Sequence, residues 1–292
     1  MLAQQVVNGL MLGAIYVLVG VAFTMTIGVL NFLNFSIPAI FMLGGMLSWA
    51  LIALGGLPWL AAVAIGFAAG GAASLVVERF TYRWLRSSHP DVPLISSVGF
   101  LVLFEHLVIL YMGAHIQRFP VPFGDANLRV AGLIISIPQL CALAIAVGLV
   151  FALDRLLRRT QLGRCLRAIA ESPDTARLLG VDTNRIVPAL FVISGMFTAL
   201  GGILFAANYL QVSPFIGNEV ALKGVAAMII GGMGNIWGAV LGGLLIGVLE
   251  SLSIHFFGGA KAEIVIFASL LAFLCIRPTG LYGDRGVRVQ RV

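Results

Sequence analysis

"MLAQQVVNGLMLGAIYVLVGVAFTMTIGVL", residues 1–30, begins an uncharged run that extends to Val77. About 20 consecutive apolar residues suffice for one helical crossing of a bilayer, so this run predicts roughly three crossings. Across the 292 residues, 60% are hydrophobic and only 10% are charged, whereas an ordinary soluble domain is about 45–50% apolar and about 25% charged. The sequence therefore predicts an all-α, polytopic membrane protein that lies in membrane lipid.

Further apolar stretches follow at lengths that suit helical crossings. We expect about eight full transmembrane helices and one short half-helix. The full-length stretches are near 5–27, 36–55, 58–77, 94–113, 138–156, 187–209, 236–254 and 262–277, and the half-helix is near 223–233. No internal repeat separates them, so we interpret residues 1–292 as a single transmembrane domain.

The basic residues gather in three connections between these stretches, namely 78–91, 154–185 and the tail from Arg277. Because cytoplasmic loops are enriched in Lys and Arg, all three are expected to face the cytoplasm. Three crossings before Glu78 then place the N-terminus outside, and the C-terminus lies inside. These loops account for the net charge of +6, and no basic groove with interleaved aromatic residues indicates a nucleic-acid partner.

Two polar or glycine-rich breaks interrupt apolar sequence: "NFLNFSIP", residues 31–38, and "GGMGNIWG", residues 231–238. Both predict discontinuous helices. Backbone freed by such a break must be buried in protein or line a wet cavity, and transporters often place substrate sites there. Alternatively, glycine and proline simply allow close helix packing. The candidate residues of a translocation pathway at the breaks are Asn31, Asn34, Phe35, Gly231, Gly232 and Asn235.

Ionisable residues inside apolar stretches form a second group of candidates. Glu105 and His106 lie in mid-segment, where an ionisable side chain is costly and suggests a function. Glu105 is therefore a pathway candidate, and a hydrogen bond between helices is the alternative. Glu250 is expected to reach the membrane interface. Glu219, on the outward side, is expected to pair with Lys223 one helical turn away, and contact with a docking protein is the alternative.

The segment "GRCLRAIAESPDTARLLGVDTNRI", residues 163–186, is polar in an otherwise apolar chain. Ser172 suits an N-cap, Pro173 a first helical residue and Gly180 the end of a helix of about two turns. A helix this short is unstable alone in water, so it must pack against something. It either rests on the membrane surface or docks a cytoplasmic partner.

No recognisable catalytic or metal-binding pattern occurs in the sequence. G-x-x-x-x-G-K-[ST], H-E-x-x-H and G-x-S-x-G are all absent. The three cysteines are far apart and match neither a metal site nor a disulfide framework. We therefore expect a non-enzymatic chain that holds no cofactor and no metal itself.

Three stretches carry a resemblance to a known family. They are "NGLMLGAIYVLVGVAFTMTIGVLNFLNFSIPAIFMLGGM", "RAIAESPDTARLLGVDTNRI" and "KGVAAMIIGGMGNIWGAVLGGLLIGVLES". They resemble the membrane-spanning permeases of branched-chain amino acid ABC importers, the LivH-type subunit. The resemblance extends from Asn8 to about Tyr282. It implies a multi-pass permease of the bacterial cytoplasmic (inner) membrane that moves its substrate inward by alternating access.

In such an importer, residues 157–186 would form a coupling loop whose short helix contacts an ATP-binding subunit. The candidate coupling residues are Glu171, Asp174, Ala176, Arg177, Leu178 and Gly180. The resemblance implies four kinds of partner: a second, LivM-like permease, two cytoplasmic ATPase subunits that bind ATP and Mg, an external solute-binding protein, and an amino-acid substrate.

The resemblance leaves the substrate open. Branched-chain amino acids, other amino acids, and urea or short amides are all compatible with the permease type. A stand-alone channel or ion-coupled carrier is the alternative outside this family. Such a protein would need more buried ionisable residues than Glu105 and His106 provide.

Overall fold

The computed structural model describes residues 2–85, 91–121, 127–130 and 133–283. Its described residues contain six helices long and apolar enough to cross a membrane, with the second span extending from Trp59 to Leu85 and the third from Val92 to Met112. These helices are α1 (Leu2–Leu30), α3 (Trp59–Val77), α5 (Asp91–Met112), α6 (Ile137–Arg159), α9 (Thr183–Tyr209) and α11 (Ile236–Phe257). The predicted polytopic, α-helical membrane fold is confirmed.

Three shorter apolar helices correspond to the remaining predicted stretches. They are α2 (Ile37–Ala53), α10 (Ile216–Gly231) and α12 (Gly259–Ile276), with 17, 16 and 18 residues. Together with the six long helices they fall on the nine stretches that the sequence predicts, although only six of the described helices are long and apolar enough to count as full spans. α2 ends at Ala53, before the end of the stretch predicted near 36–55, and α10 begins earlier than the half-helix predicted near 223–233.

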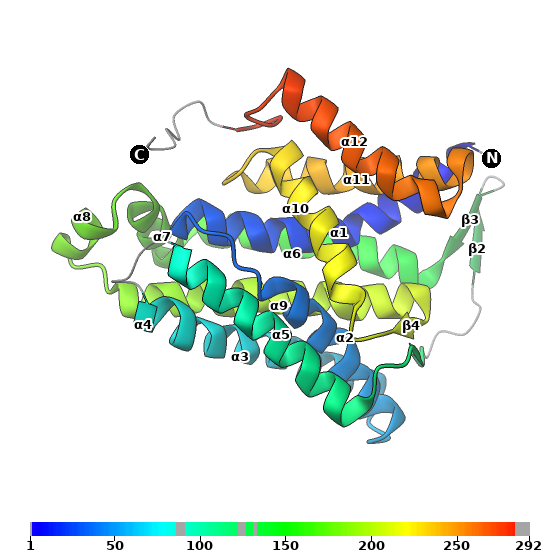
Figure 1. Cartoon of the computed structure of the whole chain (residues 1–292), viewed down its shortest axis with the longest axis horizontal. Helices are drawn as coiled ribbons and strands as arrows, with labels where there is room; N and C mark the ends of the chain where they lie inside the picture. Colours follow the sequence, from blue (N-terminus) through cyan, green and yellow to red (C-terminus); the bar gives the residue numbers. More distant parts are fainter. Residues whose placement is uncertain (1, 86–90, 122–126, 131–132, 284–292) are drawn as a thin grey trace.

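Short elements lie at the two ends of the bundle (Figure 1). At one end are the π-helix η1 (Glu78–Tyr82), α4 (Arg83–Leu85), α7 (Gln161–Glu171) and α8 (Pro173–Leu178). At the other end are two antiparallel strand pairs. β1 (Gln117–Arg118) pairs with β4 (Gln211–Val212), and β2 (Asn127–Val130) pairs with β3 (Leu133–Ser136). The chain starts at the strand end, whereas residues 277–283 lie toward the α8 end.

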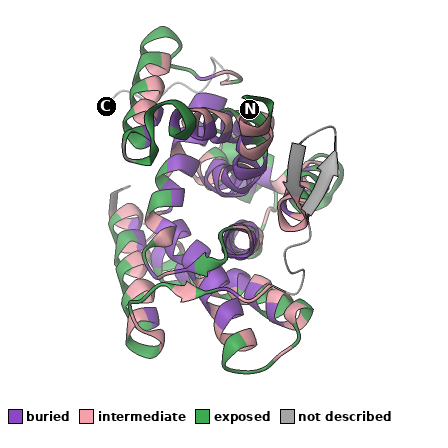
Figure 2. Ribbon diagram, turned by 90° about the vertical axis from the view of Figure 1, so that its right-hand side faces the viewer, coloured by how far each residue is buried: buried purple, intermediate pink, exposed green. Residues whose placement is uncertain are grey.

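α1 is the central helix of the bundle, with every residue from Met11 to Thr26 buried. Buried residues gather in the middle of the bundle, and exposed residues dominate its peripheral helices (Figure 2). Many of the exposed side chains are apolar, for example Leu110 on α5 and Leu271 on α12. An apolar surface on peripheral helices is what contact with lipid requires.

Glycines allow α1 and α11 to approach closely. A Cβ atom added to Gly247 would lie 2.3 Å from the backbone nitrogen of Gly13, and one added to Gly9 would lie 2.6 Å from the Cα of Val248. Small residues at such contacts let membrane helices pack through their backbones. Close packing thus explains glycines on these two helices.

Candidate coupling segment and helix breaks

The polar segment forms two consecutive helices, α7 and α8, separated at Ser172. The Ser172 hydroxyl accepts a hydrogen bond from the backbone N–H of Thr175 at 3.4 Å, which caps α8 as predicted. The chain leaves the helix through Gly180, whose φ of +84° suits glycine. The predicted short helix is therefore confirmed.

One face of this segment packs on the bundle. Ile169 of α7 and Ala176 of α8 are each 1% exposed and join a buried cluster with Val77 and Phe191. The turn from α6 into α7 is tight, because a Cβ on Gly163 would lie 1.9 Å from the Leu157 carbonyl oxygen. The rest of the chain therefore holds the segment in place.

The opposite face of α8 is exposed. Leu178 and Leu179 are 88% and 76% exposed, although leucine side chains gain about 1.5–3 kcal/mol from burial. Arg177 Nη1 lies 3.4 Å from Asp174 Oδ1, and the Asp174 side chain is 91% exposed. The face thus combines an apolar patch with a charged pair that water screens.

The first break, between α1 and α2, is a turn built on two asparagines. Asn31 has φ +56°, a left-handed conformation that asparagine tolerates better than most residues. Asn34 is 1% exposed, and its Oδ1 accepts from Ser36 N at 3.1 Å and Ser36 Oγ at 2.7 Å. The N–H of Phe35 donates to Ser97 Oγ of α5 at 3.0 Å. Asn34 thus hydrogen-bonds within the turn, and the Phe35 backbone joins the turn to α5.

The second break, between α10 and α11, depends on glycine. Gly232 and Gly234 have φ +105° and +86°, and a Cβ on Gly231 would lie 2.2 Å from the Gly238 carbonyl carbon. Asn235 caps α11, with its Oδ1 accepting from Gly238 N at 3.2 Å. Residues 281–282 hydrogen-bond to this turn, where the N–H of Tyr282 donates to the Gly231 carbonyl at 2.9 Å.

The two breaks meet beside the coupling segment. A Cβ on Gly28, just before the first break, would lie 3.1 Å from the Cα of Gly234 in the second. Both breaks open on a cavity of about 1110 Å³. Four of the predicted site residues line it: Asn31, Glu171, Asp174 and Asn235. The structure therefore brings together the start of the coupling helix and both predicted discontinuities.

Glu105 lies apart from this cavity, on the peripheral helix α5. Its side chain is partly buried and makes no hydrogen bond or ion pair among the described residues. The neighbouring His106 is exposed, and its Nδ1 lies 2.9 Å from the Val102 carbonyl oxygen of its own helix. The structure thus joins neither residue to the helix breaks.

A buried charged cluster replaces the pairing expected from the sequence. Lys223 does not pair with Glu219, because its Nζ lies 2.5 Å from Glu250 Oε1. The Tyr16 hydroxyl donates to Glu250 Oε2 at 2.6 Å. Lys223 and Glu250 are each only 8% exposed, so the expectation that Glu250 reaches the interface was wrong. The pairing satisfies both charges inside the bundle.

Comparisons with known proteins identify the family. Residues 5–274 match the family described as "Branched-chain amino acid transport system / permease component". The chain is 33% identical to the high-affinity branched-chain amino acid transport system permease protein BraD of Pseudomonas aeruginosa, with 96% of this chain and 95% of BraD covered. It is 32% identical to LivH of Salmonella typhimurium, the permease protein of a system with the same description, over the same shares of the two chains.

A solved structure supports the fold independently. The chain superposes on a chain of PsaBC from Streptococcus pneumoniae in complex with Fab, with a TM-score of 0.53 and 12% identity. The match covers 94% of this chain and 92% of that one. At this identity the likeness concerns the fold alone. The family match and the two relatives each cover nearly all of the sequence, and the chain belongs to the family of branched-chain amino acid transport permease components.

Proposed function

We propose that this chain, as the permease subunit of an ABC importer, moves branched-chain amino acids into the cell by alternating access. ATP hydrolysis would take place in two cytoplasmic partner subunits that bind ATP and Mg. A second, homologous permease would complete the pathway, and an external solute-binding protein would deliver the substrate. The names of the BraD and LivH relatives support this substrate class.

The exposed apolar face of α8 is the observation that carries the proposal. Leu178 and Leu179 extend from a segment that the chain anchors through Ile169 and Ala176. An exposed apolar patch with a polar rim is typical of a protein interaction site. The patch lies where an ATPase subunit could bind and push on the chain.

The distribution of charge supports a cytoplasmic position for this end of the bundle. Arg79, Arg83, Arg164 and Arg167 all lie on the short helices of the α8 end, and basic residues favour the cytoplasmic side. The N-terminus would then be outside. In a variant with the native cysteines replaced, a cysteine at Asn184 should react with a membrane-impermeant thiol reagent only in inverted vesicles. Labelling in intact cells would instead show that the α8 end of the bundle faces outward.

The position of the breaks suggests how movement of α8 reaches the pathway. Asp174, in the first turn of α8, lines the same cavity as Asn31 and Asn235. A displacement of α8 would therefore act directly on two turns that lack continuous helical hydrogen bonds. Such non-helical turns absorb changes of backbone angle more readily than a helix does. In this proposal both breaks belong to the translocation pathway.

Leu178→Asp tests the docking role. The change should abolish co-purification of the ATPase subunits and reduce ATP-dependent leucine uptake to background in proteoliposomes, because it places a charge in the apolar contact. Leu54→Asp is a matched control, since Leu54 is 75% exposed at the end of α2 and is not part of the α7–α8 segment. The control should retain its ATPase subunits. Normal co-purification and uptake by Leu178→Asp would refute the docking role, and wild-type uptake of urea but not leucine would refute the substrate class.

A further inference from the structure

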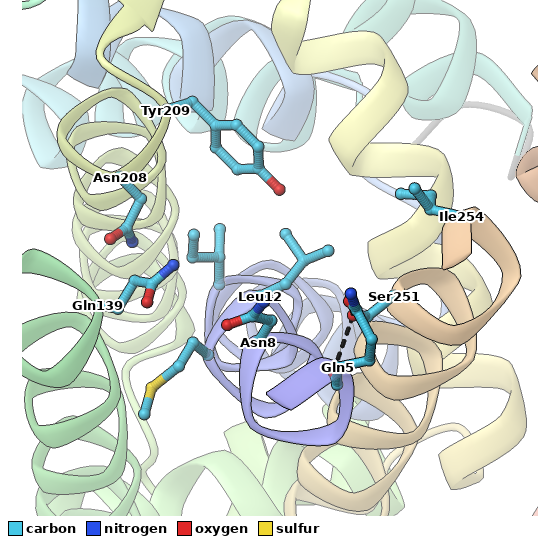
Figure 3. Close-up of a pocket in the computed structure, with 10 residues that line it drawn as sticks. Gln5, Asn8, Leu12, Gln139, Asn208, Tyr209, Ser251 and Ile254 are labelled. Carbon is cyan, nitrogen blue, oxygen red and sulfur yellow. Dashed lines mark hydrogen bonds between the residues drawn. The ribbon is translucent and has the colours of Figure 1, made fainter. Parts of the chain in front are cut away.

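Cavities lie at both ends of α6, and they differ in charge. At the strand end, a cavity of about 230 Å³ is lined by Gln139 and other uncharged side chains (Figure 3). At the α8 end, a cavity of about 370 Å³ is lined by Asp154, Arg158 and Arg167. Two arginines and one aspartate leave this charged cavity with one positive charge, which favours an anionic ligand.

The Arg158 side chain is oriented by its neighbours but keeps its terminal amino groups free. Its Nε lies 2.8 Å from Asp154 Oδ1, and the same oxygen accepts a hydrogen bond from Trp237 Nε1 at 3.0 Å. Among the described residues, neither Nη1 nor Nη2 of Arg158 makes a hydrogen bond. The side chain is 67% exposed. Because a guanidinium group binds phosphate through two parallel N–H···O bonds, Arg158 is arranged to bind a phosphate group.

An apolar groove begins at the same tryptophan. It measures about 120 Å³, and all of its lining residues are apolar. Most of them come from α6 and α11, including Leu143, Val147, Phe151, Trp237, Val240 and Leu244. The Trp237 ring packs edge-on against Phe151, with 5.4 Å between the ring centres, while its N–H is used by Asp154. Trp237 also lines the charged cavity, so the groove and the cavity meet at its ring.

One face of α6 joins the groove to the charge. Five residues recur along the helix at intervals of four, four, three and four: Leu143, Val147, Phe151, Asp154 and Arg158. This is the spacing of a single helical face. The helix rises about 12 Å from Leu143 to Phe151 and about 10 Å more to Arg158, and half of a bilayer's hydrocarbon core is about 15 Å thick. The apolar part of this face thus matches the depth of one lipid leaflet, with the arginine at headgroup level.

This face is open to lipid. Val147 and Phe151 are 46% and 58% exposed, and the buried residues of α6 lie on its other side, toward the bundle: Ala142, Ala146, Val150 and Leu153. A soluble protein could reach the arginines but not a groove at membrane depth. The groove and the positive charge together therefore fit a molecule with both an apolar chain and an anionic group.

We propose that α6 and α11 bind one anionic phospholipid from the leaflet at the α8 end. Its phosphate accepts hydrogen bonds from Arg158 and Arg167, and one acyl chain lies in the groove against Val147, Phe151 and Trp237. Basic pockets between membrane helices suit anionic headgroups in this way. A zwitterionic lipid binds less well, because its headgroup brings a second positive charge toward the two arginines.

Native mass spectrometry of the protein, purified in detergent with its co-purifying subunits and titrated with dioleoylphosphatidylglycerol, tests the site. Arg158→Gln removes a phosphate contact and should weaken binding of the first lipid at least tenfold. Arg167→Gln should act in the same direction and serves if Arg158→Gln fails to assemble. Val147→Trp fills the groove from an exposed position and should also weaken binding at least tenfold.

Each change has a matched control at an exposed position. Arg164→Gln removes the same charge from α7, and Ile145→Trp adds the same bulk to α6, but neither residue lines the charged cavity or the groove. Both controls should bind phosphatidylglycerol as the wild type does. If Arg164→Gln weakened binding as much as Arg158→Gln, the lipid would be attracted by the basic surface in general, and the specific site would be overturned.

The choice of probe separates the possible ligands. Dioleoylphosphatidylcholine should bind at least tenfold more weakly than phosphatidylglycerol, and inorganic phosphate should not displace the bound lipid. Equal affinity for the two lipids would overturn the anionic headgroup, and displacement by phosphate would overturn the role of the groove. Unchanged lipid binding by both Arg158→Gln and Val147→Trp would overturn the site. If Arg158→Gln lost its co-purifying subunits but kept the lipid, the arginine would belong to a protein interface instead.

Discussion

Lys223 and Glu250 form an ion pair in the interior of the helix bundle, with 2.5 Å between Lys223 Nζ and Glu250 Oε1. Tyr16 completes the cluster through its hydrogen bond to Glu250 and through its ring, whose centre lies 5.7 Å from Lys223 Nζ. The three residues belong to α10, α11 and α1. One neutralised charge pair thus links the central helix to the helical hairpin that contains the second break.

Glu250→Leu should destabilise the protein strongly. The substitution leaves the Lys223 ammonium group buried without its counter-charge, and breaking a buried pair in this way costs about 3–5 kcal/mol. Lys223→Met/Glu250→Leu removes both charges and should recover most of the lost stability, because an apolar pair of similar volume is often as stable. Thermal unfolding of the purified protein, monitored as the loss of its monodisperse peak in size-exclusion chromatography, measures both effects.

Glu219→Gln is the control for that experiment. Glu219 is exposed and lies four residues before Lys223, so its loss should change the unfolding temperature little. If Glu219→Gln destabilised the protein as much as Glu250→Leu, Glu250 would not be the partner of Lys223 that matters for stability. A double variant as unstable as Glu250→Leu would show that packing, not charge, accounts for the loss.

The sequence contained part of the signal for this pair. The contacts Gly231–Gly238 and Ala227–Gly242 show that α10 and α11 form an antiparallel hairpin. Continuing that register places Lys223 level with Ile246, one helical turn from Glu250, a distance that a long lysine side chain spans. Local spacing instead favoured Glu219. The hairpin register depends on glycine contacts in three dimensions, so sequence spacing alone could not decide between the two partners.

Helix identity and local capping could be predicted from sequence, whereas the assembly of the site could not. Ser172, Pro173 and Gly180 act through neighbours in the chain, so their pattern correctly predicted α8. The shared cavity of Asn31, Asn235 and Asp174 results from packing between helices far apart in sequence. Likewise, nothing in the pattern around Asn34 showed that its side chain would be used within the turn rather than in an open cavity.

Gly247→Ala should destabilise the protein through the contact between α1 and α11. The added Cβ would lie 2.3 Å from Gly13 N, and overpacking of this kind costs about 1–3 kcal/mol. Gly148→Ala is matched, since Gly148 is also within a long helix but has nothing within 4 Å of an added Cβ. Alanine is favoured over glycine in helices by about 1 kcal/mol, so the control should be neutral or slightly stabilising. Equal unfolding temperatures for the two variants would contradict the close approach.

Asn31→Val should destabilise the first break, whereas Asn31→Gly should leave its stability unchanged. The φ of +56° at Asn31 is accessible to glycine but costs about 1–2 kcal/mol for an ordinary L-residue, with β-branched side chains worst. We therefore expect Asn31→Gly to unfold at the wild-type temperature and Asn31→Val to unfold earlier. If valine were tolerated as well as glycine, the turn would not require a left-handed residue. Leucine uptake by Asn31→Gly then reports whether the asparagine side chain itself serves the pathway.

Reversing the charges of Asp174 and Arg177 separates docking from folding at α8. Their ion pair is exposed and spans 3.4 Å, and such pairs contribute only about 0.2–1 kcal/mol, so the permease should fold normally with either charge reversed. A docking surface is sensitive to the position of each charge. Asp174→Arg and Arg177→Asp should each lower substrate-stimulated ATPase activity and leucine uptake in the reconstituted importer. The swapped double variant restores an ion pair but inverts the surface pattern, so it should remain defective. Full recovery in the swapped variant would show that the pair acts only within α8, and unchanged uptake in all three variants would leave α8 as a surface helix without a coupling role.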